Sequence, residues 1–512
     1  MSRLRLASSA VVWTACGLAL LLAVALAAVA ADDPTPADAR RALLKAVGFF
    51  HTKVARHGGY VWRYSSDLAH GQGEGTAGPD RIWIQPPGTP AVGLAFLETY
   101  AATGDAACLE AARDAAHALV RTQLHSGGWA YSGTFDPTER TKQHYRVPPS
   151  RGKPDVTVRA DEPGGWDAWR RRRYPANRTM LDDDTTQSAL RLLVQFDRVT
   201  KFQDASVHEA AEYGLASLMA AQYPVGAWSH NYDRFPRRRP DPSHYPVKDA
   251  SYPDSWSRTW TKDFTGCYML NDRITLDAIR TLLDAHAAYG KAAYREAAVR
   301  GGEFLLRARM PNPQPAWAQQ YDRHMHPVWD RAFEPPAITG FESQDVLETL
   351  LLLHARTGER RFLEAVPESL AYLRRSLLPD GTLARFYELR TNRPLFFTKK
   401  YALTYDRGEM PSHYSFVVTS RLEAIARRYQ DLVQHGPDGK AAEPPLAELA
   451  AGAREAIAAM DERGAWTEPG MVRDVEGHKV VPPDGVIASE TFIQRVTALS
   501  RYVGRARGHA RP

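Results

Sequence analysis

The sequence predicts an all-α fold: an α/α toroid, built as an incomplete α/α barrel of helical hairpins, with short irregular β pieces and long loops on one face. Two observations predict it. A unit of two helical segments joined by a short turn recurs along the chain. The two largest insertions, 130–178 and 229–266, follow the same step of successive units and therefore fall on one face. Repeated hairpins form an open solenoid or a closed toroid, and a single decorated face above inner helices favours the toroid.

Each unit pairs two segments whose apolar residues have the spacing that buries one face of a helix. The four pairs are 91–100 with 109–124, 183–199 with 207–222, 274–289 with 294–309, and 346–356 with 362–377. A Gly/aromatic step closes each unit, as in Gly127-Gly128-Trp129 and Gly226-Ala227-Trp228. Thr89-Pro90 predicts a helix start with Thr89 as its cap. Strands are expected only in short pieces such as 81–84.

Both ends of the chain differ from the repeats. Residues 1–31 have the basic start, apolar run and A-x-A site of a signal peptide, so we expect an exported protein, secreted or periplasmic. The apolar run is also long enough for an uncleaved membrane tether, which stays an alternative. Residues 32–435 are expected to form the toroid domain, and 436–512 a helical extension packed on the same domain.

Composition excludes several classes of protein. The chain is 44% apolar and 24% charged, with no second apolar run of membrane length. Its net charge of +6 suits a polyanionic partner. The basic runs 170–173 and 237–239 have no base-reading motif around them, so no nucleic-acid partner is expected. Cys108 and Cys267 show no metal-binding spacing, and burial is favoured over pairing. We expect a monomer.

Acidic residues crowd the starts of the first helices in successive units. Leu181-Asp182-Asp183-Asp184 opens one and Leu270-Asn271-Asp272 another. Ordinary helix capping is one explanation, but three successive carboxylates are more than a cap needs. Because like charges repel, such a cluster needs a cation or must take up protons. Calcium is the cation that prefers oxygen ligands in an exported protein.

The stretch 315–343 is too rich in Pro and aromatic residues to be a helix, although helical patterns flank it. A long loop of this kind inside a compact domain is usually functional. Its polar side chains are those of a site: Gln319, Gln320, Asp322, His324, His326, Arg331 and Glu334. A surface crossover with folded-in aromatics is the alternative.

Several segments resemble the family 10 polysaccharide lyases, the pectate lyases. W-A-Q-Q-Y-D followed by R-A-F-E-P-P-A-I-T-G-F-E-S resembles the family's signature, and T-M-L-D-D-D-T-T-Q-S-A-L-R-L-L resembles its T-I-D-N-x-A-T-x-x-Q-L-R-x-L. Q-Y-P-V-G-A-W, L-N-D-R and F-Y-E-L-R-T-N-R-P-L-F-F are similar to its Q-Y-P-x-G-G-W, F-N-D-D and F-Y-E-x-x-T-N-R-P-x-F. The five segments keep the family's order between about Gly58 and Tyr405.

The resemblance implies a role for individual residues. It implies that Arg331 is the catalytic base, and that Asp182, Asp183 and Asp272 bind Ca²⁺ and the substrate carboxylate. As substrate-binding residues we expect Trp228, Arg393, Lys399, Gln320 and Glu334. The implied activity is that of a carbon–oxygen lyase acting on an acidic polysaccharide, polygalacturonate or a related polyuronate.

The chain departs from the family pattern around these residues. Asp183 replaces an Asn, Arg273 an Asp and Ala227 a Gly, and S-H-N-Y-D stands after Trp228 where the family has P-Q-[YF]-Y-P. The two insertions adjoin these changes. Lyase chemistry is therefore better supported than pectate as the particular substrate.

The chemistry of uronate β-elimination fits such a site. The base removes the C5 proton beside an ionised carboxylate, which must be neutralised, and calcium with basic side chains does so. An arginine base requires the pKa of Arg331 to be depressed by calcium and neighbouring cations, with an alkaline optimum. The alternatives are a glycoside hydrolase that pairs Asp182 or Asp183 with Glu334, and a non-catalytic glycan-binding protein.

Overall fold

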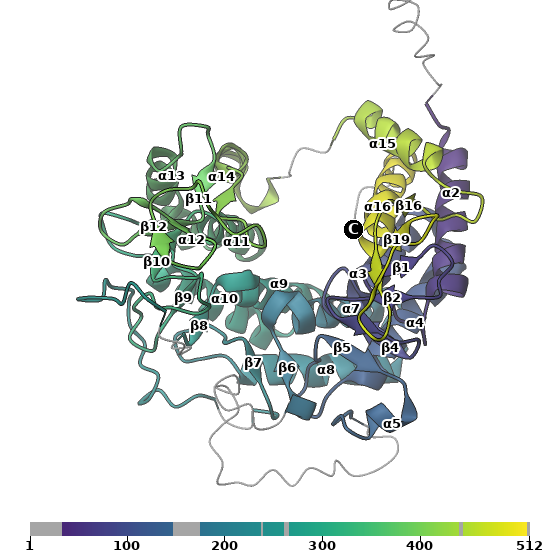
Figure 1. Cartoon of the computed structure of the whole chain (residues 1–512), viewed down its shortest axis with the longest axis horizontal. Helices are drawn as coiled ribbons and strands as arrows, with labels where there is room; N and C mark the ends of the chain where they lie inside the picture. Colours follow the sequence, from purple (N-terminus) through teal and green to yellow (C-terminus); the bar gives the residue numbers. More distant parts are fainter. Residues whose placement is uncertain (1–32, 147–174, 237–238, 261–265, 440–443, 509–512) are drawn as a thin grey trace, which may run out of the picture.

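The computed structural model describes residues 33–146, 175–236, 239–260, 266–439 and 444–508. The predicted signal peptide, most of the first insertion and the basic run 170–173 lie outside these ranges. Within them, helical hairpins are arranged in an arc that stays open between α14 and α15 (Figure 1). None of the helices in these ranges combines the length and apolarity that crossing a membrane requires.

Four consecutive hairpins form most of the arc. The first helices of the pairs pack side by side, in the order α3, α7, α9 and α11, while each second helix lies outside its partner (Figure 1). The hairpins are α3 (Thr89–Thr103) with α4 (Ala106–Thr122), α7 (Thr185–Val199) with α8 (Ala205–Ala220), α9 (Ile274–Tyr289) with α10 (Ala292–Ala308), and α11 (Glu342–Thr357) with α12 (Arg361–Glu364) and α13 (Val366–Arg375). The predicted incomplete toroid of helical hairpins is confirmed.

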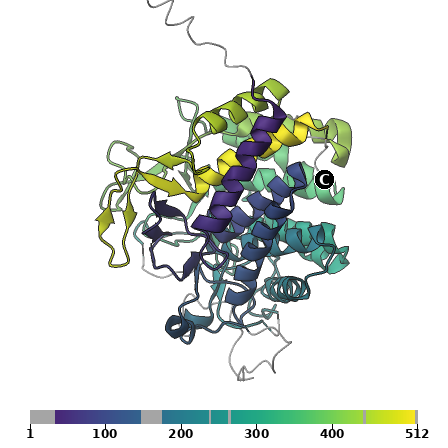
Figure 2. The same ribbon diagram turned by 90° about the vertical axis from the view of Figure 1, so that its right-hand side faces the viewer.

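The two ends of the chain complete the arc at the side of α3. Helix α16 (Ser489–Ala506) packs against α3 and against α2 (Pro36–Phe49), and α15 (Leu446–Ala458) packs on α16 (Figure 2). At the other side, α14 (Leu422–His435) packs on α11. The last helix thus enters the inner row directly before the first hairpin.

A buried tryptophan fixes each of the first three hairpins, which explains the repeated Gly/Trp step. The indole N–H of Trp129 donates to Leu119 O at 2.9 Å, that of Trp228 to Leu218 O at 2.8 Å, and that of Trp317 to Leu305 O at 2.7 Å. All three rings are fully buried. Each tryptophan therefore closes the C-terminal end of a second helix, and Trp466 does the same with Ala456 O at 2.8 Å.

Strands are short, as predicted, and most of them join loops on the face that carries the site. A four-stranded sheet has the order β10 (Ala337–Thr339), β12 (Phe386–Glu388), β13 (Pro394–Phe397) and β14 (Leu403–Thr404). A five-stranded sheet has the order β16 (Thr467–Glu468), β19 (Val486–Ala488), β1 (Arg63–Ser65), β2 (Gly71–Gln72) and β3 (Thr76–Ala77). Through β19 and β16, the C-terminal segment pairs with the N-terminal strands.

Two-stranded ladders complete the β structure of the described ranges. They are β4 (Arg81–Trp83) with β5 (Ser132–Thr134), β6 (Thr179–Met180) with β7 (Asn231–Tyr232), β8 (Tyr268–Met269) with β9 (Gln320–Tyr321), β11 (Leu383–Ala384) with β15 (Val417–Val418), and β17 (Val472–Arg473) with β18 (Lys479–Val480). β6–β7 and β8–β9 stand directly before the starts of α7 and α9. They hold the loops after Trp129, Trp228 and Trp317 against those helix starts.

Two local expectations have clear outcomes. The cap of α3 is Gly88, not Thr89 as predicted, because the Thr89 hydroxyl accepts from Tyr60 N at 2.9 Å instead. Cys108 and Cys267 are both free and buried, which confirms the expectation that they are buried and not paired.

Candidate active site

Two short turns bring the predicted metal ligands together. Asp182 and Asp183 lie in η5 (Asp182–Asp184) before α7, and Asp272 lies in η6 (Asn271–Arg273) before α9. Because α7 and α9 are neighbours in the inner row, their starts meet. Asp182, Asp183 and Asp272 each offer a carboxylate oxygen, and these oxygens lie within 4.8 Å of one another. We call these three residues the acidic cluster.

Capping does not account for the acidic cluster. No side chain caps the N-terminus of α7 or α9. Each turn has two successive residues in the left-handed region, Asp183 and Asp184 (φ 49° and 58°) and Asp272 and Arg273 (φ 46° and 61°). Such a backbone costs about 1–3 kcal/mol per residue and is retained mainly at functional sites. The strained turns aim carboxylates at one point instead of at their own helix termini.

The third carboxylate of the run, Asp184, points elsewhere. It forms an ion pair with Arg191, whose side chain is almost completely buried. Arg191 also donates to Thr281 Oγ1 at 3.1 Å, which joins α7 to α9. Of the three successive aspartates, the first two therefore belong to the site and the third to the packing of the helices.

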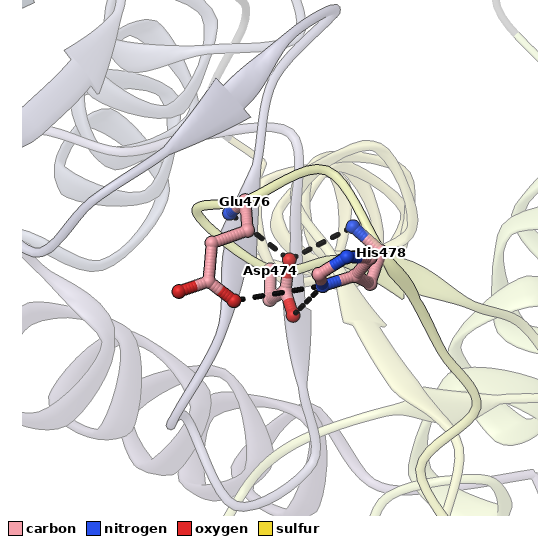
Figure 3. Close-up of side chains that lie close together, drawn as sticks. All are labelled: Asp474, Glu476 and His478. Carbon is pink, nitrogen blue, oxygen red and sulfur yellow. Dashed lines mark hydrogen bonds and ion pairs between the residues drawn. The ribbon is translucent and has the colours of Figure 1, made fainter.

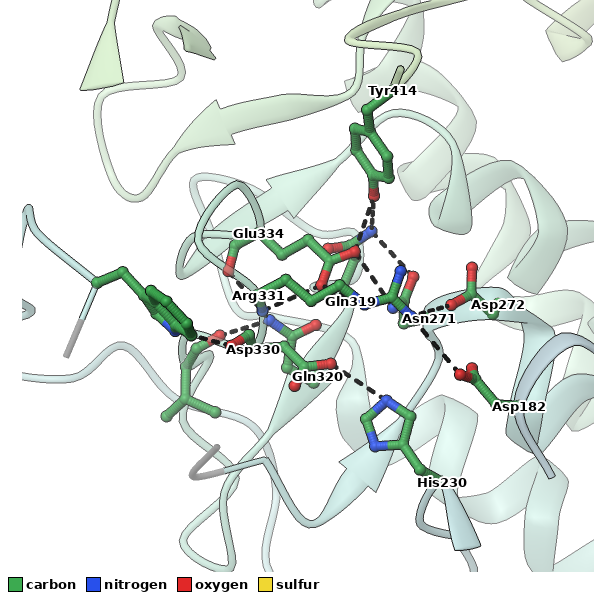
Figure 4. Close-up of polar contacts among 12 residues, drawn as sticks. Asp182, His230, Asn271, Asp272, Gln319, Gln320, Asp330, Arg331, Glu334 and Tyr414 are labelled. Atoms are coloured by element: carbon green, nitrogen blue, oxygen red, sulfur yellow. Dashed lines mark hydrogen bonds and ion pairs between the residues drawn. The ribbon is translucent and has the colours of Figure 1, made fainter. Parts of the chain in front are cut away.

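Arg331 lies over the acidic cluster (Figure 4). Its Nη2 donates to Asp272 Oδ2 at 2.9 Å and lies 3.6 Å from Asp182 Oδ2. Its Nε lies 3.7 Å from Glu334 Oε2. About a third of the side chain (35%) is exposed, whereas Asp182 is 8% and Glu334 0% exposed. The guanidinium is thus the solvent-facing member of the group, and the loop between β9 and β10 carries it, as predicted.

Glu334 supports Arg331 from below. Its Oε2 accepts the backbone N–H of Arg331 at 3.1 Å, and its Oε1 accepts from Tyr414 Oη at 3.1 Å and Asn271 Nδ2 at 3.4 Å. Gln319 bridges the same group, with Nε2 3.2 Å from Asn271 Oδ1 and 3.0 Å from Tyr414 Oη. Fully buried and bonded on both oxygens, Glu334 is a positioning residue with no surface for a substrate.

Other residues predicted to contact substrate lie in three different settings. The prediction that Trp228 contacts substrate is wrong. Its ring is fully buried and closes the C-terminal end of α8, so it offers no face to a sugar. Gln320 is buried in β9 and donates to Val328 O at 2.6 Å, which shapes the Arg331 loop. Arg393 and Lys399 are exposed at the two ends of β13, and Arg393 stacks on Tyr405 with its Cζ 3.4 Å from the ring centroid.

Sequence reasoning missed a buried ion pair beside Arg331. His230 Nε2 lies 3.2 Å from Asp330 Oδ2, and both side chains are nearly inaccessible. Burial lowers the pKa of His230, but Asp330 raises it more, to about 9. The available signal was the departure S-H-N-Y-D, which places a histidine where the family pattern has glutamine.

Two further partners of the acidic cluster come from the N-terminal part of the chain and were also missed. Tyr131 Oη donates to Asp182 Oδ2 at 2.8 Å, and Gln85 Nε2 donates to Asp183 Oδ2 at 2.7 Å. Neither position has a recognisable motif in the sequence. Tyr131 follows the tryptophan of the first closing step, so only the repeat itself could have pointed to it.

The acidic cluster has the electrostatics of a cation site. Burial and the charge of Asp182 raise the pKa of Asp183 to about 6, and the same causes raise that of Asp272 well above its usual range. Among the described residues, Asp182 Oδ1 is buried without a hydrogen-bond partner. Carboxylates outnumber cationic side chains here: Asp182, Asp183, Asp272, Asp330 and Glu334 against Arg331 and His230. The donor set is all oxygen, so these residues fit a calcium ion.

The pKa of Arg331 moves in the direction opposite to the expected depression. Burial lowers it, but the carboxylates of Glu334, Asp272 and Asp182 raise it above that of an ordinary arginine. The depression expected from calcium and neighbouring cations therefore stays a prediction. A depressed pKa of Arg331 would require another cation to balance the charges of these carboxylates.

A second group with metal-binding side chains lies on the turn between β17 and β18 (Figure 3). Asp474 Oδ1 already accepts the backbone N–H groups of Glu476 and His478, at 3.0 and 2.8 Å. The His478 side chain is 75% exposed. These contacts make an ordinary Asp-stabilised turn.

Comparisons with known proteins find one matching family model and several solved structures of similar fold. Residues 159–382 match the family model of pectic acid lyase. A family 10 polysaccharide lyase from Cellvibrio cellulosa is 19% identical, with 65% of this chain and 94% of that chain covered and a TM-score of 0.39. A mutant of such a lyase from the same organism, in complex with trigalacturonic acid, is 18% identical, with 67% and 98% covered and a TM-score of 0.39.

A D-mannose isomerase is 12% identical, with 93% of this chain and 99% of that chain covered and a TM-score of 0.47. No curated protein matches the chain. The segment that matches the family model contains the acidic cluster, His230 and Arg331. The resemblance to the family 10 polysaccharide lyases, predicted from the sequence motifs, is thereby confirmed.

Proposed function

We propose that this chain is an exported, monomeric polysaccharide lyase that cleaves polygalacturonate or a related polyuronate by calcium-assisted β-elimination. The observation that carries the proposal is the position of Arg331, which is about one-third exposed and lies 2.9 Å from Asp272 and 3.6 Å from Asp182, two of the three converging carboxylates. The match of residues 159–382 to the pectic acid lyases supports the same reaction class.

In this reaction a base removes the proton from C5 of a uronate. The electron pair left at C5 forms the C4–C5 double bond, and the O4-linked sugar leaves with the electrons of its C–O bond. In this proposal Arg331 takes the proton. A bound calcium ion would neutralise the uronate carboxylate and so acidify the C5 proton.

The acidic cluster serves this chemistry in two ways. Asp182, Asp183 and Asp272 would hold the ion, with further oxygens from substrate and water. In the cation-free protein the carboxylates of Glu334, Asp272 and Asp182 hold Arg331 protonated. Balancing their charge therefore both prepares the substrate and releases Arg331 to act as a base.

The hydrolase alternative needs a second carboxyl group that reaches the glycosidic oxygen. Burial raises the pKa of Glu334 to about 7, against the opposing charge of Arg331, which is a suitable value for a general acid. Glu334 nevertheless has no exposed surface and lies beneath Arg331. The arrangement therefore favours elimination over hydrolysis.

A screen of acidic polysaccharides, with calcium and with a chelator, tests the proposal. Elimination gives an unsaturated uronate that absorbs ultraviolet light, hydrolysis gives a saturated sugar end, and a binding protein gives no product. Calcium-dependent ultraviolet absorbance from polygalacturonate or another polyuronate is expected. Reducing ends without that absorbance would identify a hydrolase, and binding without product a glycan-binding protein.

A further inference from the structure

The second insertion reaches the loop that carries Arg331. Trp260 Nε1 donates to the carbonyl oxygen of Asp330 at 2.8 Å, and Ser257 O accepts from Trp329 Nε1 at 2.7 Å. Two hydrogen bonds thus join residues 257–260 to the two residues before Arg331. Because both bonds use the rigid indole ring, this part of the insertion has a defined position relative to Arg331.

Arg258 lies between these two anchors and contacts the four-stranded sheet. Its Nη1 pairs with Glu388 Oε1, and its Nη2 lies 3.3 Å from Tyr405 Oη. Its Cζ lies 5.0 Å from the ring centroid of Trp256. The guanidinium of Arg393 also stacks on Tyr405, with its Cζ 3.4 Å from the ring centroid. Trp256, Arg258, Tyr405 and Arg393 form a continuous set, which we call the basic–aromatic row.

This row is open to solvent and carries excess positive charge. Arg258 is 47% and Tyr405 39% exposed, whereas Glu388, the carboxylate that the row encloses, is 11% exposed. The row therefore has two guanidinium groups and one carboxylate, which pairs with Arg258. The acidic cluster has the opposite balance of charge.

An anionic sugar matches both properties of the row. An aromatic ring offers an apolar face to the C–H side of a sugar, and a planar guanidinium binds a carboxylate through two parallel hydrogen bonds. In a polyuronate every unit carries a carboxylate. A chain with one unit at the acidic cluster would bring a neighbouring unit to a positive, ring-lined surface.

We propose that Trp256, Arg258 and Tyr405 form a binding subsite for an anionic sugar unit beside the reacting one. The subsite is supplied by the insertion 229–266 together with the strand end after β14, and it rests on the proposed lyase function. A purely structural role is the competing explanation, since Arg258 and Glu388 also tie the insertion to the sheet.

Binding of polygalacturonate, measured by calorimetry with calcium in an Arg331→Lys background, separates the two roles because the substrate is not consumed. We expect Arg258→Gln and Trp256→Ala each to weaken binding by about tenfold, the size of one charge-assisted contact or one ring contact. With Arg331 intact, the same variants should raise KM and leave kcat nearly unchanged. Among the described residues Trp256 forms no hydrogen bond, but its ring packs partly against the core, so its variant should melt slightly lower. Arg258→Gln changes an exposed ion pair and should keep the melting temperature.

Arg361→Gln is the matched control. Arg361 also pairs with carboxylates, Glu359 and Glu303, and lies 5.1 Å from the ring centroid of Phe362, but it belongs to α12 on the outside of the arc. It should leave binding unchanged. Unchanged affinity in both row variants, or a loss that only accompanies a lower melting temperature, would overturn the subsite. If the Arg331→Lys protein without a further substitution binds no acidic polysaccharide, the lyase function is rejected, and the subsite with it.

Discussion

Arg331 can be tested as base and as counter-charge with two substitutions. Arg331→Lys keeps one positive charge near Asp272 and Asp182 but removes the guanidinium. If Arg331 is the base, turnover should fall by about 10²–10⁴-fold, the usual contribution of a positioned base. Substrate affinity should change little, because the charge above the acidic cluster is retained.

Arg331→Gln removes the charge as well and should have an additional effect. The guanidinium lies 2.9 Å from Asp272 and 3.6 Å from Asp182, so it competes with a cation for the same carboxylates. At an effective dielectric constant of about 20, one unit charge at roughly 6 Å contributes about 3 kcal/mol. A third of the side chain is exposed and solvent screens part of this. We expect calcium to bind at least about tenfold more tightly.

The assays are turnover by ultraviolet absorbance, calcium affinity by calorimetry and the melting temperature of both variants. Arg309→Gln is a suitable control, because Arg309 pairs at 2.7 Å with Glu368 on the outer helices, away from the acidic cluster. Normal turnover in Arg331→Lys would remove Arg331 from the chemistry. Unchanged calcium affinity in Arg331→Gln would show that the acidic cluster is not the cation site.

Three further outcomes are expected. The pKa of Asp183 is raised to about 6, so between about pH 4 and 6 the folded protein binds more protons than the unfolded chain. The contribution of Asp183 to the free energy of unfolding therefore falls as pH rises from about 4 to 6. The calcium affinity should rise over the same range, because the carboxylate becomes ionised. Titration calorimetry across that range checks this, and a flat affinity would contradict it. Asp182→Asn should lower calcium affinity and activity with little change in stability. Asp184→Asn should instead lower the free energy of unfolding by about 3–5 kcal/mol, because it leaves the buried Arg191 without its carboxylate. Denaturation and calcium titration of both variants test this, and the reverse pattern of effects would contradict it. Trp228→Phe should lose the hydrogen bond to Leu218 O and about 1–2 kcal/mol of stability, without any change in KM, and a raised KM would restore Trp228 to the substrate site.

The sequence by itself determined the architecture, because the repeat is a local property. Apolar spacing defines each helix, and the Gly/Trp step marks where a hairpin closes, so the four pairs could be read without knowing their contacts. The clustering of Asp182, Asp183 and Asp272 was also predictable, since equivalent positions of neighbouring hairpins must meet. The resemblance to the family 10 lyases implied that Arg331 is the base.

Only the tertiary structure decided what each polar or aromatic residue does. Trp228 looked available to a sugar, but the closing step turns its ring inward, where the indole N–H satisfies a helix carbonyl. Glu334 and Gln320 share the loop of Arg331 and lie beneath it, so they position rather than bind. The partners Tyr131, Gln85 and His230 come from segments far apart in the chain, and no local pattern marks a contact of that kind. The assembled carboxylates also set the direction of the Arg331 pKa shift, because their excess around the guanidinium exists only once the turns before α7 and α9 are brought together.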